Sequence, residues 1–237
     1  MSTDSQQALR IDRLSFAWAR ADAQTWALRI PQWVLPAGAR AFLHGPSGSG
    51  KSTLLSLIGG VLLPDAGCVQ VLGQDLAALS TAARDRFRAD HLGMIFQQFN
   101  LIPYLSVLDN VLLPCRFSAQ RRARIMSRAS EPRHEAQRLL RRLDLAADDW
   151  SRPVARLSIG QQQRVAAARA LLGAPALILA DEPTAALDVD RQRAFLDLLL
   201  AECERSAAAL LFVSHDLRLA DRFDQVWSLP RLTAAPS

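Results

Sequence analysis

The chain almost lacks lysine. Of its 237 residues, 28 are lysine or arginine, and only Lys51 is a lysine. Every other such positive charge is carried by arginine, whose planar guanidinium does not replace a compact ammonium. A lysine at this one position therefore indicates a place where a compact charge is required.

Other absences narrow the class of protein. The three cysteines, Cys68, Cys115 and Cys203, are far apart and lack metal-ligand spacing or the even number of a disulfide framework, so we expect reduced thiols in a cytosolic protein. No apolar stretch reaches the ~18 residues of a membrane span. Residues 1–7 lack the pattern of a signal peptide. The formal charge is +5, but the arginines are scattered and no aromatic RNA-binding motif is present, so we expect no nucleic-acid partner.

Lys51 lies in the stretch GPSGSGKS at 45–52, which matches the pattern Gly, four residues, Gly-Lys-Ser. Glycine tolerates positive φ and has no Cβ, so the backbone N–H groups of such a stretch can turn inward around phosphate oxygens. Residues 39–44 predict a strand before it, and residues 52–58 predict a helix after it. The alternative is a flexible glycine-serine turn, but the strand–loop–helix context favours a phosphate loop, the name used below for 45–52.

The phosphate loop predicts specific contacts with a nucleotide. Lys51 would reach the β- and γ-phosphates, and the Ser52 hydroxyl would ligate Mg²⁺. The positive end of the following helix would attract the same phosphates. The residues expected to bind the nucleotide here are Gly45, Pro46, Ser47, Gly48, Ser49, Gly50, Lys51, Ser52 and Thr53.

The order of elements predicts an α/β protein. Alternating residues between 9 and 33 predict antiparallel strands, whereas the apolar runs 176–180 and 210–213 are typical of a parallel sheet covered on both faces. Residues 191–208 predict the crossover helix between those two runs. Residues 81–145 are rich in arginine and helix-favouring residues, and predict an inserted helical part.

An acidic pair follows the first apolar run. Asp181 and Glu182 come at the carboxyl end of a predicted strand, which faces the ligand crevice of an open α/β sheet. There Asp181 can hold Mg²⁺ through water, and Glu182 can orient and deprotonate an attacking water. The alternative is a strand-to-turn boundary that happens to be acidic, but the phosphate loop upstream favours the catalytic interpretation.

The segment LSIGQQQR at 157–164 closely resembles the signature motif of ABC transporter ATPases. The resemblance extends from about residue 9 to residue 227, with further motifs in the family's order. Trp18 takes the place of the aromatic that stacks on adenine, Asp188 that of the D-loop aspartate, and His215 that of the switch histidine.

The Q-loop glutamine of this family also has a counterpart. Gln97 resembles it better than Gln98 does, because the family places this glutamine two residues before a phenylalanine, here Phe99.

The resemblance implies a fold. We expect an α/β protein with a P-loop NTPase (RecA-like) core, an antiparallel β subdomain and an inserted α-helical subdomain. Residues 1–237 would form a single ABC ATPase domain, with the core and its antiparallel part at about 8–85 and 166–230. The helical subdomain would span about 86–165.

The resemblance also implies a mechanism that uses ATP and Mg²⁺. Two copies of the chain face each other head to tail, and each ATP lies between the phosphate loop of one copy and the signature segment (157–164) of the other. Hydrolysis lets the copies separate and drives an integral membrane permease, which holds the chain at the cytoplasmic face of the inner membrane. The residues that would carry this mechanism outside the phosphate loop are Trp18, Gln97, Ser158, Gly160, Gln161, Asp181, Asp188, Glu182 and His215.

Their roles follow from the same resemblance. The Mg²⁺ ligands would be Ser52, Gln97 and Asp181, and the catalytic group would be Lys51, Gln97, Glu182 and His215. Ser158, Gly160 and Gln161 would contact the nucleotide of the partner copy.

Two positions depart from the family's pattern. Ile159 stands where the signature motif usually has the first of two glycines, which predicts an altered turnover rate. His44 precedes the phosphate loop where a small or aliphatic residue is usual. We favour a structural role for His44 over a pH-sensing one.

The subgroup is indicated by two features, residues 99–111 and the glutamines 161–163. Both resemble the lipoprotein-releasing and macrolide-exporter ATPases, whose permease has a large periplasmic domain. Importers of polar amino acids share similar motifs and remain an alternative. So do a soluble ABC ATPase of repair or translation, a P-loop kinase, and a nucleotide-binding regulator that has lost hydrolysis.

The arginines between 116 and 128 form a basic cluster in the predicted helical part. A solvated helix face is one interpretation of the cluster, and a surface near anionic lipid headgroups is the other.

Overall fold

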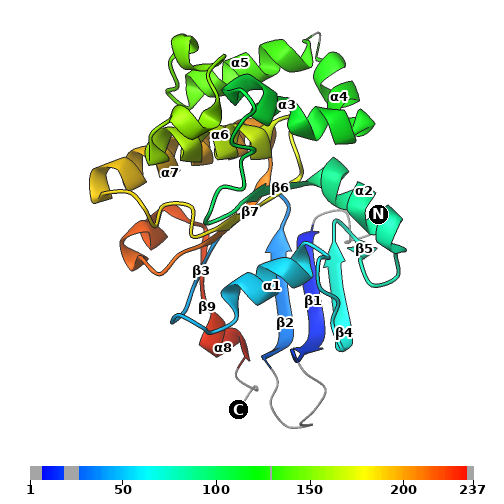
Figure 1. Cartoon of the computed structure of the whole chain (residues 1–237). Helices are drawn as coiled ribbons and strands as arrows, with labels where there is room; N and C mark the ends of the chain where they lie inside the picture. Colours follow the sequence, from blue (N-terminus) through cyan, green and yellow to red (C-terminus); the bar gives the residue numbers. More distant parts are fainter. Residues whose placement is uncertain (1–6, 19–26, 129, 234–237) are drawn as a thin grey trace.

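The computed structural model describes residues 7–18, 27–128 and 130–233, which form two sheets and a group of helices (Figure 1). The first sheet has the strand order β2-β1-β4-β5 and is antiparallel. Its strands are β1 Gln7–Phe16, β2 Leu28–Pro36, β4 Ala66–Val71 and β5 Gln74–Asp75. This sheet confirms the antiparallel strands predicted from the alternation near the N-terminus.

The second sheet is parallel, with the strand order β6-β7-β8-β3-β9. Its strands are β3 Arg40–His44, β6 Leu92–Ile95, β7 Leu177–Asp181, β8 Ala209–Val213 and β9 Gln225–Ser228. The two apolar runs predicted as parallel strands are β7 and β8, paired from Leu177 with Ala209 to Asp181 with Val213.

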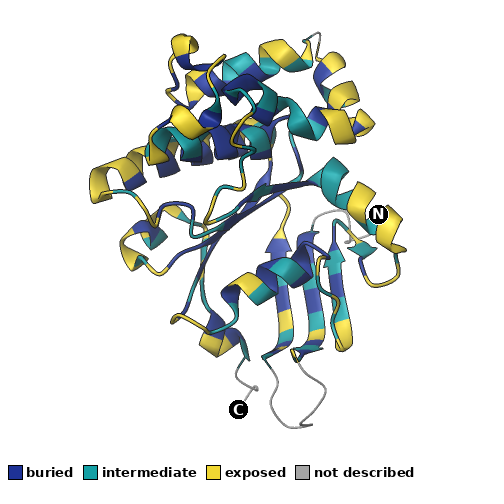
Figure 2. Cartoon of the chain, in the orientation of Figure 1, coloured by how far each residue is buried: buried dark blue, intermediate teal, exposed yellow. Residues whose placement is uncertain are grey.

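The parallel sheet separates two apolar cores, which explains the uninterrupted apolar runs of its central strands β7 and β8. On β7, Ile178 and Ala180 pack with the helices on one face, whereas Leu177 and Leu179 pack toward the antiparallel sheet on the other. Successive strand residues point to opposite faces, so a strand covered on both sides needs an uninterrupted apolar run. Figure 2 shows these central strands as almost entirely buried.

The helices divide between the two cores. Helix α1 (Lys51–Ile58) lies between the sheets and buries Leu54, Leu57 and Ile58. At the top of Figure 1, a helical lobe consists of α3 Val107–Phe117, α4 Ala119–Met126, α5 Pro132–Arg142 and α6 Ile159–Leu171. The remaining α-helices of the described residues are α2 Thr81–His91, α7 Val189–Ser206 and α8 Leu229–Thr233. Within the described residues, no helix is long and apolar enough to cross a bilayer.

Strand β6 falls inside the range 86–165 that the sequence assigned to the helical subdomain, and this part of the assignment is wrong. β6 pairs with β7 in the parallel sheet, from Leu92 with Leu177 to Ile95 with Ala180. In a run of only four apolar residues, the spacing of apolar positions does not show whether the run is a strand or a helix. Gly93 fits this position because a Cβ there would lie 2.5 Å from the carbonyl oxygen of Ala170 on α6.

The basic cluster is only partly an exposed face: Arg116, Arg122 and Arg128 are exposed, whereas Arg121 and Arg124 turn inward. Arg121 is buried and donates hydrogen bonds to the carbonyl oxygens of Ala89 (2.7 Å) and Leu172 (2.8 Å). Arg124 donates to the carbonyl oxygen of Gly173 at 2.8 Å. These guanidinium groups join α4 to the ends of α2 and α6, so neither the solvated face nor the lipid-facing surface describes the cluster as a whole.

Candidate nucleotide site

The phosphate loop connects β3 to α1 and depends on its glycines. Gly48 and Gly50 have φ values of 77° and 98°, in the left-handed region that favours glycine. At Gly50, a Cβ would also lie 2.9 Å from Cδ2 of Leu28. No side chain caps the start of α1 and its first turn has no acidic residue, so its N-terminal N–H groups are available to an anion.

Lys51 is the first residue of α1 and its side chain is largely buried. Its Nζ donates hydrogen bonds to the carbonyl oxygens of Gly45 (2.8 Å) and Pro46 (3.1 Å). The same nitrogen lies 3.9 Å from Oε1 of Glu182. The ammonium is thus held across the loop, next to the carboxylate that follows β7.

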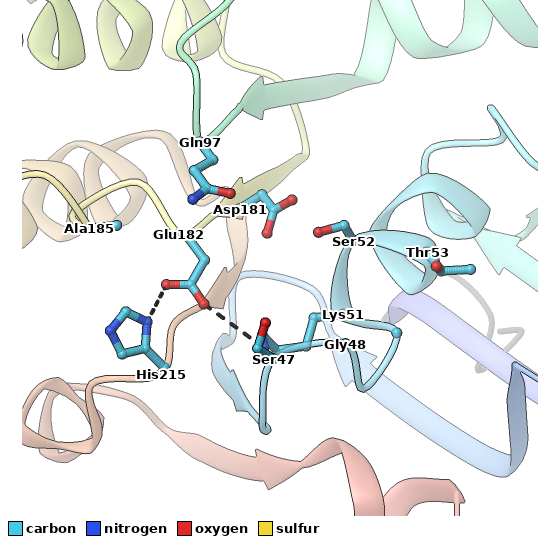
Figure 3. Close-up of a pocket in the computed structure, with 11 residues that line it drawn as sticks. Ser47, Gly48, Lys51, Ser52, Thr53, Gln97, Asp181, Glu182, Ala185 and His215 are labelled. Carbon is cyan, nitrogen blue, oxygen red and sulfur yellow. Dashed lines mark hydrogen bonds and ion pairs between the residues drawn. The ribbon is translucent and has the colours of Figure 1, made fainter.

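Asp181 ends β7 and faces Ser52 across the site (Figure 3). Burial raises the pKa of Asp181, an effect that the hydrogen bond with Ser52 opposes. Its Oδ1 is buried and, within the described residues, has no hydrogen-bond partner. An unpaired carboxylate oxygen beside a hydroxyl is the type of ligand pair that Mg²⁺ prefers, so these residues fit the ion.

The protein alone offers few ligands for a metal at this place. Among the described residues, no group of three or more His, Cys, Asp or Glu side chains is placed to hold a metal ion. Mg²⁺ commonly binds through one or two protein groups together with substrate phosphates and water. The site therefore fits Mg²⁺ that arrives with a nucleotide.

Glu182 has an uncommon backbone conformation. Its φ is 46°, in the left-handed region, and it precedes Pro183, which further restricts its backbone. A non-glycine residue in this conformation lowers the stability of the fold by about 1–3 kcal/mol, and it keeps the conformation only where neighbouring groups hold it there. Its N–H donates to the carbonyl oxygen of Val213 at 2.9 Å, which ties it to β8.

The carboxylate of Glu182 lies between two cationic or titratable groups. Its Oε2 is 2.6 Å from Nδ1 of His215, and its Oε1 faces Lys51 (Figure 3). His215 follows β8 and is exposed, so the pair lies at the mouth of the site. The carboxylate is thus held in place with an imidazole on one side and an ammonium on the other.

These groups surround one cavity of about 550 Å³, within the range of ligand pockets. The lining residues are Ser47, Gly48, Gly50, Lys51, Ser52, Thr53, Gln97, Asp181, Glu182, Ala185 and His215. Gln97 points toward Asp181, whereas Gln98 is absent from the lining. Gln97 therefore lies at the cavity and Gln98 does not, and the role of Gln97 stays a prediction.

Three predicted phosphate-loop residues, Gly45, Pro46 and Ser49, do not line the cavity. The carbonyls of Gly45 and Pro46 hold Lys51, as described above. Ser49 has a buried hydroxyl without a hydrogen-bond partner among the described residues. Ala185 lines the cavity although the sequence analysis did not single it out, and its position three residues after Glu182 was the only available signal.

The predicted signature residues lie outside this cavity, as a site completed by a second copy would require. Ser158 is the exposed N-cap of α6 and forms a capping box with Gln161. Gln161 also donates through Nε2 to Oδ2 of Asp149 at 2.9 Å, so its side chain is already engaged within the chain. A Cβ on Gly160 would lie 3.6 Å from Leu187, which places the signature segment beside the predicted D-loop.

The two remaining predicted residues also lie outside the cavity. Asp188 caps α7 by accepting a hydrogen bond from the N–H of Arg191 at 2.9 Å. Trp18 is 67% exposed and touches Phe16 edge-on, with 5.3 Å between ring centroids. A stacking role for Trp18 stays a prediction.

Substituting Asp181 with asparagine is expected to stabilise the nucleotide-free chain by about 1 kcal/mol at pH 7.5. Burial raises the pKa of Asp181, so its ionised form is disfavoured in the folded state. The free energy of unfolding is therefore lower at pH values above the pKa of Asp181 in the folded chain. It rises again as the pH falls through that pKa toward the lower pKa of an aspartate in the unfolded chain. Denaturant titration at pH 7.5 and pH 5 measures the free energy of unfolding of variant and parent. The difference between the two free energies should be smaller at pH 5.

The exposed carboxylate of Asp190 provides a control for this experiment. Asp190→Asn should change the free energy of unfolding by less than about 0.5 kcal/mol at either pH. If Asp181→Asn were no more stable than the parent chain at pH 7.5, the burial of an unpaired carboxylate oxygen would not be what raises the pKa of Asp181.

Comparison with known proteins identifies the family. Residues 28–185 match the family model described as ABC transporter. The lipoprotein-releasing system ATP-binding protein LolD of Anaeromyxobacter dehalogenans is 45% identical over 193 residues, which are 81% of this chain and 78% of that protein. LolD 1 of Rhodopirellula baltica is 38% identical over 93% of both chains.

Solved structures agree with this match. The dimeric structure of MJ0796, a bacterial ABC transporter cassette, has a TM-score of 0.80 at 32% identity and covers 93% of this chain and 94% of that chain. The sequence match and the structural match extend over most of the chain and confirm the resemblance inferred from the motifs. This chain belongs to the ABC transporter family.

Proposed function

We propose that this chain is the ATP-binding and ATP-hydrolysing subunit of an ABC transporter, and that it powers a separate membrane permease. The observation that carries the proposal is the single cavity in which Lys51, Asp181 and Glu182 meet. Gln97 and His215 complete the group from two other loops. A P-loop kinase has no need of this set together with an exposed signature segment.

Each side chain has a distinct role in the proposed reaction. Lys51 exchanges the carbonyls of the phosphate loop for phosphate oxygens of ATP, where a hydrogen bond to a charged group contributes about 1.5–3 kcal/mol. Ser52, Asp181 and Gln97 would hold Mg²⁺, and the ion would supply positive charge next to the phosphates. Glu182 accepts the proton of the attacking water.

His215 acts beside Glu182 in this scheme. Its Nδ1 contacts the carboxylate, so it orients the base and leaves the other ring nitrogen free to face the nucleotide. Trp18 would stack on the adenine, as the resemblance implies.

A second copy of the chain completes the site in this proposal. The ATP-binding cassette MJ0796 has been solved as a dimer bound to ADP and Pi. In the present chain, Ser158 and Ile159 are exposed at the start of α6, where the Ser158 hydroxyl and the N–H groups outside the capping box suit a phosphate oxygen. ATP would then join two copies, with Gly160, Gln161 and Asp188 near the same nucleotide.

The permease partner follows from the relatives. Several of them are named lipoprotein-releasing system ATP-binding proteins, at 38–45% identity. We infer that this chain pairs with a permease of that group, which has a large periplasmic domain, and that it lies at the cytoplasmic face of the inner membrane. The lipoprotein-releasing matches favour this subgroup over the amino-acid importers.

A groove on the helical lobe suits such a partner. Leu113, Pro114 and Phe117 of α3 line a hollow of about 280 Å³, and Phe117 is 75% exposed. A short amphipathic helix docks into a groove of this kind through its apolar face.

Affinity purification of the tagged chain from detergent-solubilised membranes tests the proposal. The expected result is an integral membrane protein with a large extracytoplasmic domain, recovered together with phosphate release from ATP. Recovery of soluble repair or translation factors alone would contradict the transporter function.

Replacing Ser158 with arginine is expected to abolish ATP hydrolysis by the chain but to leave ATP binding within about twofold. The added side chain would occupy the exposed surface where the second copy must approach, while the phosphate loop stays intact. Calorimetry with a non-hydrolysable ATP analogue and a phosphate-release assay separate the two effects. The matched control is Ser127→Arg at the exposed end of α4, which should hydrolyse ATP normally. Unchanged hydrolysis by Ser158→Arg would show that the signature contact is wrongly assigned.

A further inference from the structure

The segment that follows Gln97 contains a strained turn. Phe99 and Asn100 are consecutive and have φ values of 58° and 49°, both in the left-handed region. Residues other than glycine rarely adopt this conformation, and two in succession need support from their surroundings. Residues 97–100 are called the glutamine loop below.

That support comes from Arg169, near the C-terminal end of α6. Its Nη2 donates to the carbonyl oxygen of Phe99 and its Nη1 to that of Asn100, each at 2.6 Å. The forked guanidinium thus bonds both carbonyls of the turn, a geometry that lysine cannot reproduce.

Arg169 has no compensating carboxylate among the ion pairs of the described residues. Burial lowers the pKa of Arg169, which shows that its charge is placed there at some cost. Arg164, one and a half turns earlier on the same helix, contrasts with it: Arg164 donates to Oδ2 of Asp144 at 2.8 Å. The guanidinium of Arg169 therefore serves the two carbonyls of the turn and not an ion pair.

We propose that Arg169 is a positioning residue for hydrolysis, which joins the glutamine loop to the signature helix α6 and so sets the place of Gln97 in the cavity. The inference rests on the proposed function, because it takes Gln97 as part of the reaction site. Arg169 itself does not line the cavity and acts through the backbone of residues 99 and 100.

The same helix carries Ser158 at its other end. α6 has 13 residues and is about 20 Å long, and its start is fixed by the capping box of Ser158 and Gln161. A displacement of α6 by the partner's nucleotide would move Arg169, and with it the turn after Gln97. The contact thereby connects the nucleotide of the partner copy to the catalytic cavity of this one.

The test measures kcat and ATP affinity in full-length variants. Arg169→Ala is expected to lower kcat about tenfold and to leave the Kd for a non-hydrolysable ATP analogue within twofold, since the phosphate loop is untouched. Because Arg169 acts through Gln97, the double variant Q97A/R169A should have the kcat of Q97A alone. The control is Arg142→Ala on α5, which removes an exposed arginine paired with Glu202 at 3.3 Å and should keep the parent kcat.

A second substitution distinguishes positioning from general support of the fold. Asn100→Gly removes the Cβ that opposes the left-handed turn, so R169A/N100G should recover most of the kcat lost in R169A. Arg169→Lys keeps the charge but not the fork, and should lose kcat several-fold while retaining the parent melting temperature. If R169A does not fold, the kcat of R169K decides whether Arg169 positions the glutamine loop.

Several results would overturn the inference. A parent kcat in R169A or R169K would do so, as would an additive loss in Q97A/R169A or the absence of rescue by Asn100→Gly. If Q97A is slow while R169A is normal, Arg169 alone is wrongly assigned. A normal kcat in Q97A would contradict the role of Gln97 in the proposed function, and with it the role of Arg169.

Discussion

Replacing Glu182 with glutamine is expected to slow ATP hydrolysis by about 10²–10⁴-fold, the contribution of a positioned general base. Glutamine keeps the size of the side chain but cannot accept the proton of the attacking water. ATP binding should persist, because the phosphate loop and Lys51 are unchanged. Phosphate release under saturating ATP, measured on the chain in complex with its permease, gives the rate. Calorimetry gives the affinity.

The control for this variant is Glu204→Gln, which changes an exposed carboxylate in the last turn of α7. It should hydrolyse ATP at the parent rate. If E182Q also hydrolysed ATP at that rate, Glu182 would not be the base, and its closeness to His215 would need another explanation.

Replacing Lys51 with alanine should have the largest effect on nucleotide binding and should raise the Kd for ATP by about 10–150-fold. That range corresponds to the loss of one hydrogen bond to a charged phosphate, about 1.5–3 kcal/mol. The substitution also frees the carbonyls of Gly45 and Pro46, which Lys51 holds in the nucleotide-free chain. Titration with a fluorescent ATP analogue measures the change.

Arginine at the same position separates charge from shape. Lys51→Arg keeps the positive charge but brings a flat, forked group into a site that suits a compact one, so it should also bind ATP weakly. If K51A bound ATP with the parent affinity, the phosphate-loop assignment would be wrong. If only K51R did so, the site would not require a compact charge, and the single lysine would have no special meaning.

Much of the fold could be predicted from the sequence because the signals were local. The strands β1 and β2 follow from alternation, and β7 and β8 from apolar runs that the structure shows to be covered on both faces. The phosphate loop was recognisable because glycines are required at fixed positions, with φ values of 77° and 98° at Gly48 and Gly50.

Other features depended on contacts between distant segments and could not be predicted. β6 is a four-residue strand whose identity is set by pairing with β7, about 85 residues later in the chain. The burial of Arg121 depends on carbonyls from α2 and α6, so a count of arginines in this region could not show which of them are buried and which are exposed.

The candidate site shows the same division. The types of residue at Lys51, Asp181 and Glu182 indicated their chemistry, and the structure brings them to one cavity. The left-handed backbone of Glu182 and the contact of Arg169 with the glutamine loop have no signature in a single sequence, because both arise from tertiary hydrogen bonds.

The central claim is that ATP joins two copies of this chain and that hydrolysis separates them. The most direct test is the molecular mass of E182Q by light scattering, with and without ATP and Mg²⁺. The claim predicts the monomer mass of 26.0 kDa without nucleotide and twice that mass with it. A mass that stays at 26.0 kDa while calorimetry shows ATP fully bound would contradict it.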